Sequence, residues 1–230
     1  MRPAARRAAP RRFPAAAYVA PFAAYVALLG ISPYLPVSLG IAYPLRVAFV
    51  CLVLLFLSRQ VLPRAAGRPA ASVAVGAAVF VLWILPDFLW PGYRQHRLFE
   101  NPLTGAAHSS VPLDMRGDVL FLFFRVLGSV VVVPIIEELF WRGWLIRYLS
   151  NRTFETVPLG TATRQAWWIT VFLFATEHGP YWEVGLLAGI AYNWWVGRTA
   201  NLGDCIVAHA TTNACLAAYV IHAGRWEYWM

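Results

Sequence analysis

The chain contains no lysine, and all 19 of its basic residues are arginine. Charged residues make up only 13% of the 230 residues and hydrophobic ones 60%, whereas soluble domains carry about 25% charged residues. This composition excludes an ordinary soluble domain. Arginine-only basic usage indicates a GC-rich bacterial coding sequence. The formal net charge of +8 does not indicate nucleic-acid binding, because the arginines cluster in short segments between apolar runs.

Disulfide and zinc motifs are also missing. The three cysteines, Cys51, Cys205 and Cys215, lie in apolar segments without a CxxC pair. This pattern argues against a disulfide framework and against a structural zinc site. We interpret the three as buried, inert thiols. The sequence also lacks an HExxH motif.

Long apolar segments dominate what is present. A membrane-spanning helix needs about 20 mainly apolar residues. The candidate segments are Ala15–Ile31, Ile41–Ser58, Ala71–Trp90, Asp118–Leu149, Ala162–Gly179, Trp182–Arg198 and Gly203–His222. They predict an all-α fold, a polytopic transmembrane bundle of seven or eight helices. The count is seven if residues 118–149 form one long tilted helix, and eight if Pro134 divides them.

The arginines predict an orientation. Residues 1–14 are expected to form an Arg-rich cytoplasmic N-terminus and residues 15–230 a single transmembrane domain. The first apolar run is long for a signal peptide, so it is interpreted as a retained first helix. With seven alternating spans, the outer segments then hold only Arg94, Arg97, Arg116 and Arg225. The bias of the remaining arginines toward the inner segments follows the positive-inside rule.

Two adjacent carboxylates, Glu137 and Glu138, stand in the middle of an apolar run. Carboxylates in hydrocarbon are costly and mark function unless something offsets them. On a helix, Glu138 and Arg142 are four residues apart and can form an ion pair. Glu137 points about 100° away and stays free for chemistry. A purely structural ion network is the alternative interpretation.

Two further apolar segments carry polar pairs. His178 ends the segment that begins at Phe174, and its neighbour Glu177 is expected to matter less, because adjacent positions face different ways. His209 and Asn213 share a helical face, and both can donate hydrogen bonds to a developing oxyanion while uncharged. A packing role is the alternative for each pair. Three such segments suggest one site assembled between helices, an intramembrane active-site cavity.

The motifs in these three segments are EExxxR, FxxxH and HxxxN, in that order. Their combination resembles the CPBP family of intramembrane proteases, which includes the eukaryotic CAAX prenyl endopeptidase and bacterial Abi-type proteins. The resemblance covers about residues 118–222, and all three motifs match without substitution. The run from Ile136 to Leu145 also resembles the CAAX prenyl protease-related branch found beside exosortase systems.

The resemblance implies an intramembrane endopeptidase that hydrolyses a peptide bond of a membrane-anchored peptide or protein. By the family's pattern, Glu137 would be the general base that activates a water, with His178 helping to position it. His209 and Asn213 would form the oxyanion hole. The implied surroundings are a lipid bilayer, in the bacterial cytoplasmic (inner) membrane, with an exosortase system as a candidate partner and no nucleic acid.

By the same pattern, Glu138 and Arg142 would organise the site. The resemblance also bears on cofactors. Glu137, His178 and His209 could hold zinc with a water in the fourth position. The family is described as using glutamate rather than an obligatory metal, so no cofactor is expected and zinc is kept as the alternative.

Two other functions are compatible with the same residues. A non-catalytic docking or immunity protein would use the cavity only for binding, but binding alone does not need two histidines, a glutamate and an asparagine together. A proton-coupled transporter would also place Glu and His within the membrane. The sequence shows no paired inverted halves with broken helices, which disfavours the transporter.

Overall fold

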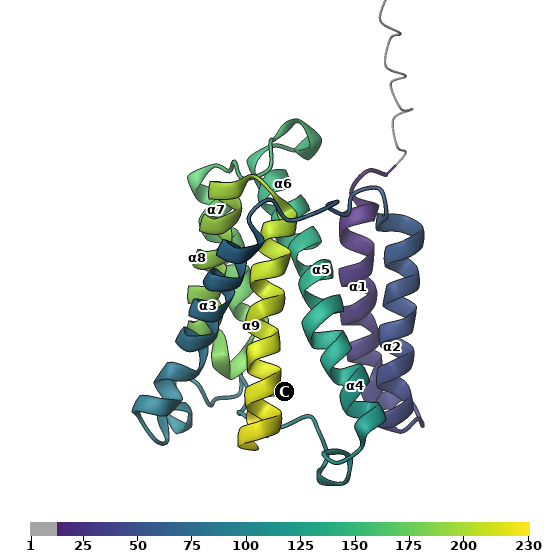
Figure 1. Ribbon diagram of the computed structural model, residues 1–230, viewed down its shortest axis with the longest axis vertical. Coiled ribbons are helices and arrows are strands. Elements are labelled where there is room, and N and C mark those ends of the chain that lie inside the picture. Colours follow the sequence, from purple (N-terminus) through teal and green to yellow (C-terminus); the bar gives the residue numbers. More distant parts are fainter. Residues whose placement is uncertain (1–12) are drawn as a thin grey trace, which may run out of the picture.

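The computed structural model describes residues 13–230, so most of the predicted cytoplasmic N-terminus, residues 1–12, lies outside the described residues. Helices that run up and down beside one another make up the molecule (Figure 1). The described part of the chain contains no β-strand, only one isolated bridge between Asn101 and Gly105. The predicted all-α class is therefore confirmed.

Seven helices make up the bundle within residues 13–230. They are α1 (Ala16–Ile31), α2 (Leu39–Val53, prolonged by a π-helical turn, Leu54–Ser58), α3 (Pro69–Leu89), one long helix (Val119–Ser150), α7 (Arg164–Thr176), α8 (Trp182–Thr199) and α9 (Leu202–Ala223). Their bounds lie within a few residues of the predicted segments. Short 3₁₀ turns lie in several of the connections, and a further one, η9 (Trp226–Tyr228), follows α9.

The long helix is continuous, so division at Pro134 and a count of eight helices are wrong for this fold. It consists of α4 (Val119–Leu127), a π-helical stretch (Gly128–Val132), α5 (Val133–Glu138), a second π-helical stretch (Leu139–Leu145) and α6 (Ile146–Ser150). Proline within a helix removes one hydrogen bond and clashes with the preceding turn. Here the wider π-helical turn directly precedes Pro134, and the helix continues past it.

Five of the seven helices are long and apolar enough to cross a membrane by themselves: Ala16–Tyr34, Leu39–Ser58, Pro69–Leu89, Val119–Ser150 and Leu202–Ala223. The protein is therefore an integral membrane protein. Sequence reasoning also assigned spans to the segments of α7 and α8. α7 has only 13 residues, about 20 Å of helix, and α8 is less apolar because it includes Glu183, Asn193 and Arg198.

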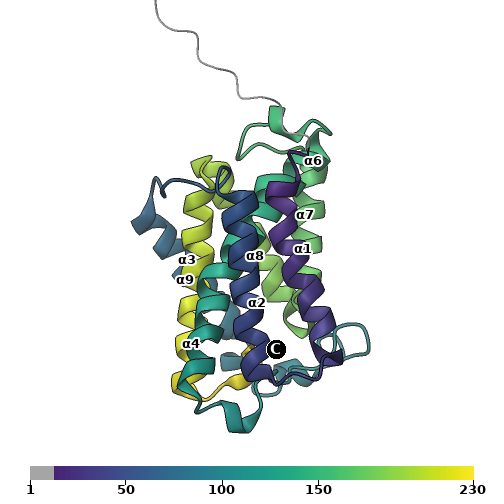
Figure 2. The same ribbon diagram turned by 90° about the vertical axis from the view of Figure 1, so that its right-hand side faces the viewer.

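Two groups of helices flank the long helix and α9 (Figures 1 and 2). α1 and α2 pack against one side of the long helix, and α3, α7 and α8 lie on the other side. α3 packs closely along α9 at Gly76, where a Cβ atom would lie 2.2 Å from the carbonyl oxygen of Ala208. The Thr212 hydroxyl uses this proximity to donate a 2.8 Å hydrogen bond to the Gly76 carbonyl.

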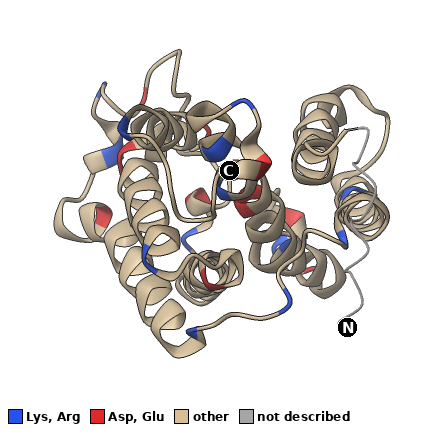
Figure 3. Ribbon diagram, turned by 90° about the horizontal axis from the view of Figure 1, so that it is seen from above, with Lys and Arg blue, Asp and Glu red and all other residues tan. Residues whose placement is uncertain are grey.

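Charged positions are sparse in the bundle, and most of the ribbon seen from above is uncharged (Figure 3). The connections that the orientation places inside, such as those after α2 and α6, lie at one end of the bundle in Figure 1. The connection before α4 and the tail after α9 lie at the other end. This arrangement is the alternation on which the predicted orientation depends, and the orientation itself stays a prediction.

Candidate active site

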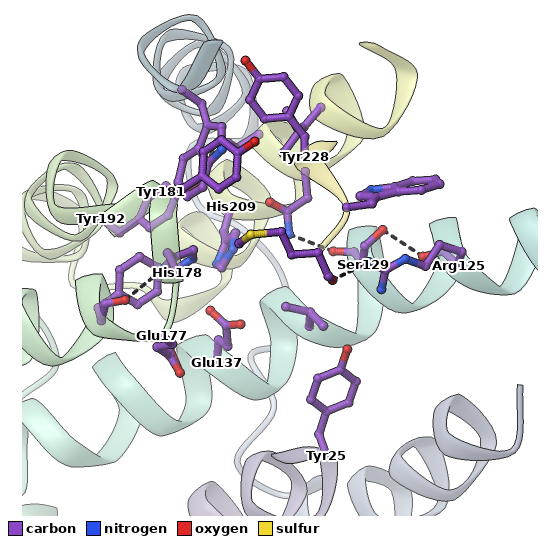
Figure 4. A pocket seen from close by; sticks show the side chains of 18 of the residues that line it. Tyr25, Arg125, Ser129, Glu137, Glu177, His178, Tyr181, Tyr192, His209 and Tyr228 are labelled. Carbon is purple, nitrogen blue, oxygen red and sulfur yellow. Dashed lines mark hydrogen bonds between the residues drawn. The ribbon is translucent and has the colours of Figure 1, made fainter. Parts of the chain in front are cut away.

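A cavity of about 380 Å³ lies between α1, α3, α7, α8, α9 and the middle of the long helix. The four residues predicted to carry chemistry, Glu137, His178, His209 and Asn213, all line it. Figure 4 shows Glu137 projecting from the long helix toward His178 and His209. The three motifs therefore meet at one place, although they come from three different helices.

Glu137 presents a carboxylate with unused hydrogen-bonding capacity. Its Oε2 atom is buried and has no hydrogen-bond partner among the described residues. Buried polar atoms nearly always have a partner, and exceptions in a native structure call for an explanation. An oxygen that faces a cavity without a protein partner is placed to bind a water or a substrate group.

Glu138 lies on another face of the helix and is fully buried. Its Oε1 atom accepts a 3.0 Å hydrogen bond from Nη1 of Arg142, which forms the expected i,i+4 ion pair. Oε1 also lies 2.9 Å from Nδ1 of His209, and Oε2 accepts a 3.1 Å bond from the Cys205 thiol. Glu138 thus connects the long helix to α9. The interpretation of Cys205 as merely inert missed this contact.

Arg142 extends the same network to the other two helices. Its Nε atom donates a 2.9 Å bond to Oδ1 of Asn193 in α8. Its guanidinium carbon lies 4.5 Å from the ring centre of Phe174 in α7, within cation–π range. The first residue of the FxxxH motif therefore contacts the arginine of the EExxxR motif. This contact gives the phenylalanine a physical role in the site.

His178 has one ring nitrogen committed to its own helix. Its Nδ1 atom lies 2.7 Å from the carbonyl oxygen of Phe174. A carbonyl can only accept, so Nδ1 carries the hydrogen and Nε2 of the neutral ring is an acceptor. Space for the ring depends on Gly185 of α8, where a Cβ atom would lie 3.0 Å from the imidazole. The small residues of α8 thus serve packing within this chain.

His209 is oriented by two neighbours. Its ring stacks on Tyr192 with centres 4.9 Å apart, and Nδ1 contacts Glu138. Because the ion-paired Glu138 carboxylate only accepts, Nδ1 carries the hydrogen and Nε2 of a neutral ring has only a lone pair. Donation from Nε2 to an oxyanion therefore requires the doubly protonated ring. This geometry corrects the expectation that His209 can donate to an oxyanion while uncharged.

Asn213 is held by a carbonyl that the long helix leaves unused. In the π-helical stretch, the Val133 amide donates to Gly128 instead of to Ser129. Pro134 has no N–H to offer to Ser129 either. The Ser129 carbonyl instead accepts a 2.8 Å bond from Nδ2 of Asn213. One of the two Nδ2 hydrogens of Asn213 is thus used, and the other remains for the cavity.

Several lining residues were not found by sequence reasoning. Glu177 lines the cavity together with His178, and Oε1 of its carboxylate accepts a 2.8 Å bond from Nε1 of Trp141. The rule that neighbours face different ways does not apply here, because α7 ends at Thr176. Arg125 and the tail residues 228–230 also line the cavity. For these lining residues the sequence offered one signal, the position of Arg125 in an otherwise apolar run.

The zinc alternative requires Glu137, His178 and His209 to converge on one point. Across residues 13–230, no three His, Cys, Asp or Glu side chains are grouped so that they could hold a metal ion. The residues present therefore do not form a ready metal site, and no step below uses one. Metal dependence stays a prediction.

Comparison with known proteins agrees with this site. Residues 119–215 match the model of the family described as type II CAAX prenyl endopeptidase Rce1-like. The segment is thus similar to the CAAX-protease (CPBP) family, a family of endopeptidases, and the match supports the resemblance found in the motifs. The matched segment contains all six residues of the three motifs that were assigned a role. No curated protein and no solved structure matches the chain.

Proposed function

We propose that this protein is an intramembrane endopeptidase that hydrolyses a peptide bond of a membrane-associated peptide or protein. The observation that carries the proposal is the buried, unpartnered Oε2 atom of Glu137 in a cavity that it shares with two histidines. A docking cavity would not need an unpaired carboxylate at this depth, because such a group is costly in hydrocarbon.

Water activation is assigned to Glu137 and His178. A water in the cavity donates one hydrogen to the Glu137 carboxylate and the other to Nε2 of His178. Transfer of the first proton to Glu137 leaves a hydroxide, which attacks the scissile carbonyl carbon. When the tetrahedral intermediate collapses, the same proton moves from Glu137 to the leaving amine. Hydrolysis then regenerates the carboxylate.

The negative charge on the intermediate is assigned to His209 and Asn213. Asn213 donates its free amide hydrogen, and its orientation is set beforehand by the Ser129 carbonyl. His209 donates through Nε2 as an imidazolium, a charge that the carboxylate of Glu138 on the opposite nitrogen offsets. Donors fixed before the reaction lower the barrier most when they surround a developing charge. Glu138 and Arg142 act by holding His209 in place.

The substrate and setting follow from the family and the composition. We propose a bacterial enzyme of the cytoplasmic (inner) membrane, with its N-terminus in the cytoplasm, that needs no metal. Prenylated substrates are a eukaryotic class, so a membrane-anchored peptide or a sorted protein's C-terminal signal is favoured. The likeness of residues 136–145 to the exosortase-associated branch makes an exosortase system the proposed partner.

The test compares wild type with Glu137→Gln in nanodiscs that carry a library of membrane-anchored peptides, with cleavage followed by mass spectrometry. Glu155→Gln is the control, because Glu155 is exposed in a connecting loop. We expect wild type and the control to cut the same peptides and Glu137→Gln to cut none while unfolding at an unchanged temperature. Equal cleavage by Glu137→Gln contradicts the mechanism. Absence of cleavage by wild type favours the docking alternative.

A further inference from the structure

Glu177 is a second carboxylate in the lining of the cavity, and the proposed mechanism does not use it. It stands directly before His178 and directly after Thr176, the last residue of α7. Figure 4 shows its side chain beside that of Glu137, although the two belong to different helical segments. The residue is exposed, whereas Glu138 on the long helix is fully buried. A group that enters the cavity can therefore reach the Glu177 carboxylate.

One hydrogen bond fixes the orientation of this carboxylate. Its Oε1 atom accepts a 2.8 Å bond from Nε1 of Trp141 in the long helix. Trp141 is only 5% exposed, and its ring packs edge-on against those of Phe174 and Phe22, with centres 6.0 and 5.9 Å away. The indole is thus held in place and holds Oε1 in turn. No second bond to the carboxylate occurs among residues 13–230, so Oε2 remains available for a ligand.

The charge of Glu177 has no counter-ion in the described part of the chain. Neither an arginine nor a histidine forms an ion pair with it within residues 13–230. Arg142, the arginine of the EExxxR motif, bonds to Glu138 and Asn193 instead. The indole N–H of Trp141 is neutral and would also bond to an uncharged amide oxygen. The contact with Trp141 therefore explains the position of Glu177 but not its charge.

The depth of Glu177 makes this charge costly. The indole that it contacts belongs to Trp141, and the long helix continues from there to Ser150. That part of the helix spans about 13 Å, so Glu177 lies well inside an apolar layer of about 30 Å. Carboxylates at such a depth mark function unless something offsets them. A carboxylate that is held by a neutral indole and reaches a cavity fits a binding site for a cationic group.

The position of Trp141 also sets the distance to the proposed chemistry. Glu137 and Trp141 are separated by one helical turn, about 6 Å along the axis, and share a side of the long helix. Glu177 bonds to Trp141 and therefore lies close to Glu137, in agreement with Figure 4. An extended peptide covers about 3.3 Å per residue. The cationic group would therefore lie within about three residues of a bond cut beside Glu137.

We propose that Glu177 is a specificity-determining residue that binds a cationic side chain of the substrate, arginine or lysine, within about three residues of the scissile bond. This inference rests on the proposed function. Oε2 accepts a hydrogen bond from the guanidinium or ammonium group, while Oε1 stays bonded to Trp141. Hydrogen bonds between two ionised groups are stronger than those between neutral ones. A substrate that is neutral at this position leaves the carboxylate without a counter-ion and binds more weakly.

Binding to the inactive variant Glu137→Gln tests the proposal without chemistry and without the charge of Glu137. Fluorescent, acyl-anchored apolar peptides, each with one arginine at a different position, are compared by anisotropy in nanodiscs of phosphatidylcholine. Each has a twin that carries citrulline, which has the shape of arginine but a neutral urea group. At one or two adjacent positions, we expect the arginine peptide to bind about tenfold or more tightly than its twin. These positions locate the cationic group in the bound peptide.

Glu177 is then varied in the same background. Glu177→Gln keeps an oxygen for Nε1 of Trp141 and removes only the charge, so it should bind arginine and citrulline peptides with equal affinity. Glu177→Asp keeps the charge on a shorter side chain and should retain part of the discrimination. Glu100→Gln is the matched control and should discriminate as fully as the parent, because Glu100 is exposed but does not line the cavity.

Equal binding of every arginine peptide and its twin by the parent, or no saturable binding of any peptide, overturns the proposal. Discrimination that survives Glu177→Gln overturns it as well, since Glu177 would then serve only to contact Trp141. The same peptides given to the active enzyme separate the two claims. Discrimination in binding without any cleavage contradicts the proposed endopeptidase and leaves the cation site standing. Cleavage without discrimination contradicts only the role of Glu177.

Discussion

Glu138 and His209 are 71 positions apart in the chain, and a 2.9 Å contact joins Oε1 of the first to Nδ1 of the second. The contact connects the long helix to α9 beside the cavity, which His209 lines. It also decides which nitrogen of His209 faces the cavity, and hence that the ring donates there only when doubly protonated. Glu138 therefore affects the chemistry of the site through His209, although its own carboxylate does not line the cavity.

Removing the charge of Glu138 is expected to destabilise the fold. Glu138→Gln keeps the size of the side chain but leaves Arg142, only 1% exposed, without its counter-ion. Breaking a buried ion pair on one side costs about 3–5 kcal/mol. Unfolding in detergent, followed by circular dichroism against denaturant, measures the loss. The double variant Glu138→Gln/Arg142→Met should recover part of it, and an unchanged stability of the single variant would refute the account of this network.

Pro134 is expected to affect catalysis through Asn213. Pro134→Ala restores an amide hydrogen beside the Ser129 carbonyl, so the helix can use that carbonyl itself and Asn213 loses its anchor. We expect kcat to fall with KM nearly unchanged, and by less than in Asn213→Ala, since loss of one oxyanion donor costs about 10²–10³ in kcat. Steady-state kinetics on a cleaved library peptide provides the measurement.

Thr211→Ala is the control for this pair of variants, because among residues 13–230 the Thr211 hydroxyl bonds only within its own helix, to the Val207 carbonyl. Its kinetics should match those of wild type. If Pro134→Ala has full activity while Asn213→Ala is impaired, the Ser129 carbonyl does not position Asn213.

Gly185 is expected to be needed for the position of His178. In Gly185→Ala the new methyl group meets the imidazole at 3.0 Å, closer than ordinary van der Waals contact, so the ring has to move away from the water that it holds. Activity should fall more than tenfold, a fraction of the 10²–10⁴ that general acid–base groups contribute. Gly197→Ala lies on the same helix with its nearest neighbour at 3.5 Å and should remain active. Equal activity of both variants would argue against a precise position for His178.

The fold could be predicted from the sequence to within a few residues at most helix ends, because long apolar runs and the turn residues between them are local signals. The Glu138–Arg142 pair was predictable for the same reason, since spacing along one helix determines it. The pairing of Glu138 with His209 was not, because it depends on how two helices pack. No local pattern places atoms of different helices within 3 Å of each other.

The rest of the site depends on departures from regular helix geometry. The π-helical stretch Gly128–Val132 brings Arg125 to the face of Glu137, and a regular α-helical projection would turn it away. Glu177 was expected to matter less because neighbouring helical positions diverge, but the helix has ended before it. The tail residues 228–230 lie outside the three motifs in sequence, and only the folded chain shows that they line the cavity.

The most direct test of the central claim is the single-turnover cleavage rate of one library peptide by wild type and by Glu137→Gln in the same nanodiscs. A glutamate that activates water predicts a loss of at least about 10²-fold in the variant, with peptide binding and unfolding temperature unchanged. Equal single-turnover rates for the two proteins would contradict the account, because another group would then have to activate the water.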